Sequence, residues 1–119
     1  VKDVLVTGAT GGVGSIAVMI LSKMGYDVHA VTGKKDKHDY LKKLGAKNIL
    51  DRKEFMGESK LLEKGMWDCV VDNVGGEGLT KILAQTKPGG IVALPGNAGG
   101  VKIATNTMPF VIRGVKLLI

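Results

Sequence analysis

The stretch VLVTGATGGVGSIAV, residues 4–18, decides the fold class of this chain. An apolar run leads into four glycines, Gly8, Gly11, Gly12 and Gly14, and a second apolar run follows them. Glycines between a strand and a helix allow a tight turn, close approach of a ligand, and close packing of helix on sheet. The first N–H groups of such a helix have no hydrogen-bond partner within it and can bind a phosphate. The pattern therefore predicts a mononucleotide or dinucleotide site.

The composition is that of one ordinary globular domain. The chain has 119 residues, of which 45% are hydrophobic and 24% are charged, and its net charge of +6 suits an anionic ligand. Its apolar runs are too short for a membrane span, so no membrane partner is expected. Cys69 is the single cysteine, and we interpret it as a small buried hydrophobe. Without a disulfide framework the chain fits a reducing compartment, and a cytoplasmic location is predicted.

Short apolar runs alternate with helical patterns along the chain, which predicts an α/β fold with a parallel sheet covered on both faces. The expected architecture is a Rossmann-type doubly wound sheet of about six strands in the order 3-2-1-4-5-6. The expected strands are residues 3–8, 27–33, 47–50, 67–76, 89–96 and 115–119. The expected helices are residues 13–24, 36–46 and 77–87, with a loop containing a weak helix in 54–65 and a turn or short helix near 107–114.

In the first expected helix, apolar residues recur at helical spacing and predict one apolar face. They are Val13, Ile16, Ala17, Ile20, Leu21 and Met24.

The end of the second expected strand indicates which dinucleotide is bound. A carboxylate at this place would hold the ribose 2′-hydroxyl of NAD, but the sequence has Thr32, Gly33, Lys34 and Lys35 and no acid before Asp36. A hydroxyl and an ammonium group would instead receive a 2′-phosphate, so NADP(H) is the predicted cofactor. The alternative is a solvated, lysine-rich helix start.

Further cofactor contacts are expected at the carboxyl ends of the later strands, where ligands of open α/β sheets bind. The candidates are Asn73, Val74, Gly96 and Asn97, whose size suits a nicotinamide and its ribose, although plain turn residues would look much the same. Asp72 is interpreted as a structural cap.

Three other polar residues are given structural roles. A turn role is favoured for Asp51 over an adenine contact, and His29 is interpreted as a satisfied sheet-face residue. With His38 expected to be solvated, no metal site is predicted.

With these residues in hand, the chain resembles the nucleotide-binding domain of a medium-chain dehydrogenase/reductase. The resemblance is to the zinc-independent quinone oxidoreductase branch and its acrylyl-CoA reductase (YhdH/AcuI-like) group. It covers nearly the whole chain, and the segments HDYLKKLGA and MPFVIRG are its most specific parts. It implies a pyrophosphate on Thr10, Gly11, Gly12, Val13 and Gly14. It also implies a 2′-phosphate on Thr32, Gly33 and Lys34, where the group has Ser-Gly-Arg.

The resemblance also implies a reaction and a larger protein. Members of the group reduce a carbon–carbon double bond conjugated to a carbonyl, as in a short acyl-CoA, with hydride from NADPH. They carry a separate catalytic domain ahead of this segment and a return segment after it. Residues 1–119 are therefore expected to be the NADP(H)-binding fragment of a longer oxidoreductase, without catalytic residues and inactive alone. A homodimer through the last strand, VKLLI, is a further expectation.

Two rival interpretations stay open. TGATGGVG also fits the loop of short-chain dehydrogenases, but the Tyr and Lys four positions apart that this class needs are not found, because Leu44 follows Tyr40 and Ala30 follows Tyr26. A non-catalytic module that senses a dinucleotide is the other alternative. No nucleic-acid partner is expected, since the basic residues at 34–43 have no aromatic stacking ladder beside them.

Overall fold

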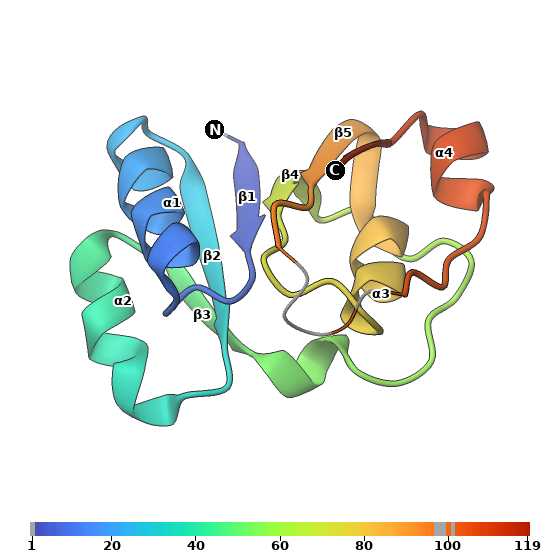
Figure 1. Cartoon of the computed structure of the whole chain (residues 1–119). Helices are drawn as coiled ribbons and strands as arrows, with labels where there is room; N and C mark the ends of the chain where they lie inside the picture. The colour runs from blue at the N-terminus through green and yellow to red at the C-terminus, as the bar shows by residue number, and fades with distance from the viewer. Residues whose placement is uncertain (1, 97–99, 101) are drawn as a thin grey trace.

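A computed structural model describes residues 2–96, 100 and 102–119 of the chain. Six parallel strands form one sheet in the order β3-β2-β1-β4-β5-β6, which confirms the predicted topology (Figure 1). The strands are β1 (Asp3–Val6), β2 (Asp27–Thr32), β3 (Asn48–Asp51), β4 (Trp67–Val71), β5 (Thr86–Ala93) and β6 (Lys116–Leu118). Because all six strands are parallel, their carboxyl ends lie at the same edge of the sheet.

Helices cover both faces of the sheet. They are α1 (Gly12–Lys23), α2 (His38–Leu44), α3 (Gly78–Ala84) and α4 (Met108–Arg113), with two short 3-10 turns, η1 (Lys35–Lys37) and η2 (Arg52–Phe55). Neighbouring residues of β1 belong to opposite cores: Val4 and Val6 pack with α1 and α2, whereas Leu5 packs with α3. This alternation follows from the two-residue period of a strand and explains why the three buried residues of β1, Val4 to Val6, are all apolar.

Two expected helices differ from the observed ones. The weak helix in 54–65 is only the turn η2 at its start, and the helix expected at 77–87 ends at Ala84. It stops early because the next residues already pair with β4: the Gln85 carbonyl accepts the Trp67 N–H, and Thr86 lies opposite Trp67 in the sheet. The indole Nε1 also donates to Gln85 Oε1 at 3.0 Å. Pairing with β4 therefore overrides the helical preference of this segment.

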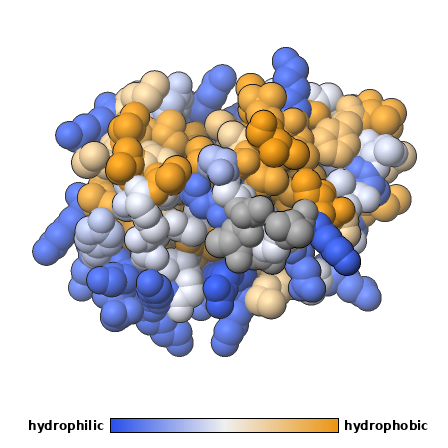
Figure 2. Space-filling model, in the orientation of Figure 1, coloured by the Kyte–Doolittle hydropathy of each residue, from blue (hydrophilic) through white to orange (hydrophobic). Residues whose placement is uncertain are grey.

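The apolar face predicted for α1 is wrong in part, because the sheet meets the line of Gly14 and Val18, which was not predicted. Of the six predicted residues, only Ala17 and Leu21 pack against the core. The other four are exposed: Val13, Ile16, Ile20 and Met24. Figure 2 shows hydrophobic residues gathered over the outer side of α1 and hydrophilic residues over α2 below it. Within the described residues no helix is long and apolar enough to cross a membrane.

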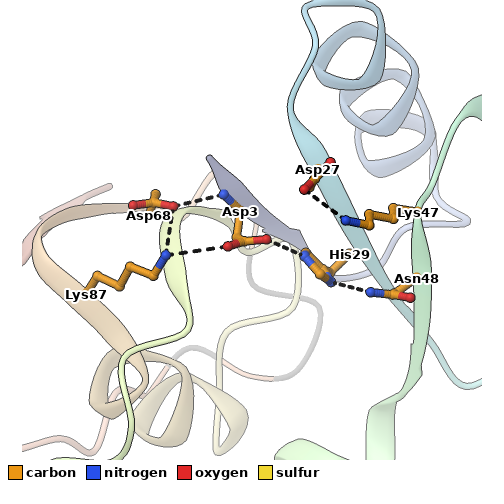
Figure 3. A network of polar contacts seen from close by, with 7 residues as sticks. All are labelled: Asp3, Asp27, His29, Lys47, Asn48, Asp68 and Lys87. Atoms are coloured by element: carbon orange, nitrogen blue, oxygen red, sulfur yellow. Dashed lines mark hydrogen bonds and ion pairs between the residues drawn. The ribbon is translucent and has the colours of Figure 1, made fainter. Parts of the chain in front are cut away.

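A polar network joins the amino ends of five strands (Figure 3). His29 of β2 contacts Asp3 of β1 (Nε2 to Oδ1, 3.0 Å) and Asn48 of β3 (Nδ1 to Nδ2, 3.2 Å). Asp68 of β4 accepts the backbone N–H of Asp3 at 2.8 Å, and Lys87 of β5 lies 3.2 Å from Asp68 and 3.4 Å from Asp3. The hydrogen bond from His29, together with Lys87, lowers the pKa of the Asp3 carboxyl. His29 is thus a satisfied sheet-face residue, as expected.

Candidate functional site

The glycine loop ends in an uncapped helix terminus. Gly11 is the N-cap of α1, and no side chain of the described residues caps it. The first helical hydrogen bond runs from the Ser15 N–H to the Gly11 carbonyl, so the N–H groups of residues 12–14 have no partner inside the helix. Such a terminus, with the positive end of the helix dipole, suits a phosphate group.

Glycine at position 14 is required by a close backbone approach. A Cβ built on Gly14 would lie 2.2 Å from the Gly8 carbonyl oxygen, far inside contact distance. At Gly12, by contrast, no described atom lies within 4 Å of such a Cβ. The loop thus combines tight internal packing at Gly14 with open space at the helix terminus.

A cavity of about 540 Å³ opens beside this loop, at the carboxyl ends of β1, β2 and β4. The turn η2 and the start of α3 form its other walls. Its lining combines polar, apolar and basic side chains, among them Thr7, Asp72, Val31, Phe55, Ile82, Lys34 and Arg52. This volume and this mixture are typical of a pocket for a small organic ligand.

The residues predicted at the end of β2 lie at this cavity, with one exception. Thr32, Gly33 and Lys34 line it, whereas Lys35 lies in η1 and is not a lining residue. Of the residues predicted in the glycine loop, Thr10 lines the cavity and residues 11–14 do not. Thr32 is only 5% exposed, and its Oγ1 accepts the Lys34 N–H at 3.0 Å. The hydroxyl keeps its own proton for donation to a ligand.

Arg52 is a lining residue that the sequence reasoning missed. Its guanidinium lies over Gly33, since a Cβ built there would be 3.4 Å from Arg52 Cζ. Arg52 and Lys34 therefore place two cations at one rim of the cavity. A signal was present in the sequence: Arg52 directly follows β3, and β3 is the neighbour of β2. Asp51 accepts the Lys53 N–H at 2.8 Å, which confirms its turn role.

Asp72 is a structural cap, as predicted. It is 1% exposed, and its Oδ1 accepts the hydroxyl of Thr7 at 2.6 Å and the N–H groups of Val74 and Gly75 at 3.0 Å each. The side-chain amide of Asn73 donates to the Thr7 carbonyl at 2.9 Å. The Nδ2 of Asn73 is therefore already hydrogen-bonded within the domain, whereas Val74 lines the cavity.

A second cavity, of about 320 Å³, lies at the carboxyl ends of β4 and β5. Its walls are small or apolar and include Gly75, Leu94, Pro95, Gly96 and Ile103. Gly96 approaches the Asn73 carbonyl so closely that a Cβ would be 2.9 Å from its oxygen. Asn97 lies outside the described residues. Among residues 2–96, 100 and 102–119 there is no group of three His, Cys, Asp or Glu side chains that could hold a metal ion.

Comparison with known proteins supports the resemblance. The family model described as zinc-binding dehydrogenase matches residues 12–118. The Escherichia coli protein named Probable acrylyl-CoA reductase AcuI is 51% identical over 115 residues, which are 97% of this chain and 35% of that protein.

Solved structures share the fold. The YhdH oxidoreductase from Salmonella enterica, in complex with NADP, has a TM-score of 0.95 and 52% identity over 98% of this chain and 36% of its own. The Bacillus subtilis protein YhfP with NAD bound has a TM-score of 0.95 and 48% identity, with the same coverage. The chain spans about a third of the length of these relatives. It belongs to the zinc-binding dehydrogenase family and, within it, resembles the nucleotide-binding part of YhdH- and AcuI-like oxidoreductases.

Proposed function

We propose that residues 1–119 form the NADP(H)-binding domain of a longer oxidoreductase that reduces a carbon–carbon double bond conjugated to a carbonyl. The single observation that carries the cofactor assignment is the pair of cations, Lys34 and Arg52, at the rim of the large cavity. A carboxylate there would repel a 2′-phosphate, and the described lining has none at the end of β2. The complexes of relatives with NADP support the same assignment.

The 2′-phosphate would be held by three side chains around Gly33. Thr32 offers a hydroxyl proton, and Lys34 and Arg52 offer charge. Lysine is a point charge, whereas the arginine fork can donate two parallel hydrogen bonds. Arg52 therefore supplies the planar donor that Lys34 lacks.

The rest of the dinucleotide would follow the carboxyl edge of the sheet. The pyrophosphate would rest on Thr10, Gly11, Gly12, Val13 and Gly14, where the start of α1 offers free N–H groups. The nicotinamide end would lie toward Val74, which lines the large cavity, and Gly96, which lines the second cavity at the ends of β4 and β5. The roles of Lys35, Asn73 and Asn97 in binding stay predictions.

The chemistry is that of hydride addition. NADPH, when bound, supplies a hydride; it adds to the β-carbon of the substrate, and a proton adds to the α-carbon, which leaves a saturated carbonyl compound. A short acyl-CoA thioester is the proposed substrate class, in line with the named relatives. This chain's residues bind and orient the cofactor. The catalytic groups are assigned to the part of the protein that the relatives carry outside the matched third.

The cofactor assignment is tested by titrating the chain with NADPH and with NADH, following the fluorescence of the reduced nicotinamide. We expect tighter binding of NADPH. Lys34→Ala and Arg52→Ala should each raise the Kd for NADPH about fivefold, which corresponds to about 1 kcal/mol for an exposed charged contact. The Kd for NADH should stay unchanged.

A matched control is Lys43→Ala, which removes an exposed lysine of α2 outside the cavity. It should change neither affinity. Equal affinity of the unmodified chain for NADPH and NADH would refute the role of the two cations. If the Lys34 and Arg52 variants lost affinity for both dinucleotides equally, the two side chains would support the fold and not the 2′-phosphate.

The last strand is proposed to pair two copies of the protein. β6 is the edge of the sheet, and Val111, Ile112, Leu118 and Ile119 are exposed on it and on the adjoining α4. An unpaired, apolar edge favours strand pairing. Light scattering after size exclusion should give twice the chain mass, and Leu118→Lys should restore the monomer. A monomer at all concentrations would contradict this assembly.

A further inference from the structure

The large cavity has one accessible carboxylate in its described lining, that of Glu77, the residue directly before α3. The other acid there, Asp72, is 1% exposed, and its Oδ1 already accepts three hydrogen bonds from the domain. Glu77 is exposed, and within the described residues it forms no ion pair and does not cap the helix behind it. Its carboxylate is therefore free to accept a hydrogen bond from a ligand in the cavity.

The turn η2 separates Glu77 from the cations of this cavity. At the start of η2, the Arg52 guanidinium lies over Gly33. At its end, Phe55 lies against the start of α3, because a Cβ built on Gly78 would be 3.7 Å from the Phe55 carbonyl oxygen. Figure 1 shows this green turn between β3 and α3. Glu77 and Arg52 thus lie at opposite ends of η2, and the cavity is positive at one end and negative at the other.

We propose that Glu77 selects adenine as the base of the dinucleotide, by accepting a hydrogen bond from its exocyclic 6-amino group. This inference rests on the proposed function and adds the choice of base to it. In adenosine 2′-phosphate the phosphate and the 6-amino group lie at opposite ends, which matches the polarity of the cavity. Between the charged ends the lining is apolar, with Val31, Phe55 and Ile82, and suits the faces of a purine.

The charges of the dinucleotide limit what Glu77 can bind. Its phosphates are anionic, so a carboxylate near them opposes binding unless it meets a hydrogen-bond donor. The ribose hydroxyl beside the 2′-phosphate is held with that phosphate at the Gly33 end. The nicotinamide carboxamide is proposed to lie toward Gly96, in the second cavity, whose described lining does not include Glu77. The 6-amino group of adenine is therefore the donor that suits the Glu77 end.

The proposal is tested with a dinucleotide that differs from NADPH in its base alone. Reduced nicotinamide hypoxanthine dinucleotide phosphate has a carbonyl acceptor in place of the 6-amino donor. Titration of the 119-residue chain, followed by nicotinamide fluorescence, gives the Kd of each dinucleotide. We expect the Kd of the hypoxanthine dinucleotide to be about tenfold higher, because a hydrogen bond to a charged group is lost. Glu77→Gln should remove this difference, since an amide can accept from the amino group and also donate to the carbonyl.

Glu58→Gln is the matched control, because Glu58 is an exposed acid outside the cavity lining; the tenfold difference should persist in it. Equal Kd values of the unmodified chain for the two bases would overturn the proposal. A difference that persists in Glu77→Gln would overturn it too, since another group would then recognise the base.

The comparison of NADPH with NADH is independent of this test, because both carry adenine. Equal affinity for NADPH and NADH would contradict the proposed function. Tighter binding of NADPH than of NADH, without discrimination between adenine and hypoxanthine, would overturn the role of Glu77 alone.

Discussion

Replacing Gly14 with alanine should destabilise the domain strongly, whereas the same change at Gly12 should not. A Cβ at Gly14 would lie 2.2 Å from the Gly8 carbonyl oxygen and 2.9 Å from the Cα of Ala9. Both are backbone atoms, so no side-chain rotation relieves the overlap, and α1 would have to move away from β1. Overpacking of a core commonly costs about 1–3 kcal/mol, and we place this variant at about 3 kcal/mol because the overlap is with backbone.

The measurement is urea unfolding followed by the fluorescence of Trp67, the single tryptophan, which is buried. With a slope of about 1.5 kcal/mol per M urea, a loss of about 3 kcal/mol lowers the midpoint by about 2 M. Gly12→Ala is the control: its Cβ meets no described atom within 4 Å, so the midpoint should stay or rise slightly. An unchanged midpoint for Gly14→Ala would refute the close-contact argument. An equal fall in both variants would mean that backbone freedom, and not the contact, is what the loop needs.

Three further changes test other parts of the fold. Asp3→Asn should lower the urea midpoint at pH 7, because the folded state lowers the pKa of the Asp3 carboxyl and is therefore stabilised by its ionised form. The difference from the unmodified chain should shrink as the pH falls below the ordinary aspartate pKa of about 3.9 and vanish once the pH is below the lowered pKa of Asp3. A difference that persists in full at low pH would contradict this. Thr7→Val removes the hydroxyl that bonds Asp72 and should cost about 1–3 kcal/mol in the same assay, with an unchanged midpoint as the contrary result. Arg113→Lys should lower the thermal midpoint of unfolding. The guanidinium of Arg113 donates to the carbonyls of Glu63, Ala84 and Thr86, and a lysine ammonium cannot reproduce this planar set of donors. Equal midpoints would show that one of these contacts suffices.

The strand order and the glycine loop could be predicted because local residues determine them. The apolar run before Gly8 and the helical pattern after Gly14 are contiguous in sequence, and right-handed crossovers leave few ways to order parallel strands. The end of the helix at Ala84 could not be predicted in this way. It depends on the pairing of Thr86 with Trp67, a contact between separate segments.

The site was predictable in part for the same reason. Thr32 and Lys34 follow the second strand directly, so their place at the ligand edge follows from topology. Arg52 reaches the same rim only because β3 lies beside β2 and the turn η2 folds back over Gly33. The apolar pattern of α1 likewise could not tell which part of its surface faces the sheet. Periodicity gives the direction of an apolar face, whereas its coverage depends on everything that packs around it.

The polar network at the amino edge bears on how the strands find their alignment. In a sheet covered on both faces, the buried residues of β1, Val4, Leu5 and Val6, are all apolar, so their hydrophobicity alone does not distinguish the correct register from one shifted by two residues. The hydrogen bond between His29 and Asp3 does not survive such a slide, and neither does the bond from the Asp3 N–H to Asp68. Side chains that add modest stability to the finished domain thereby distinguish the correct alignment from its slipped competitors while the sheet assembles.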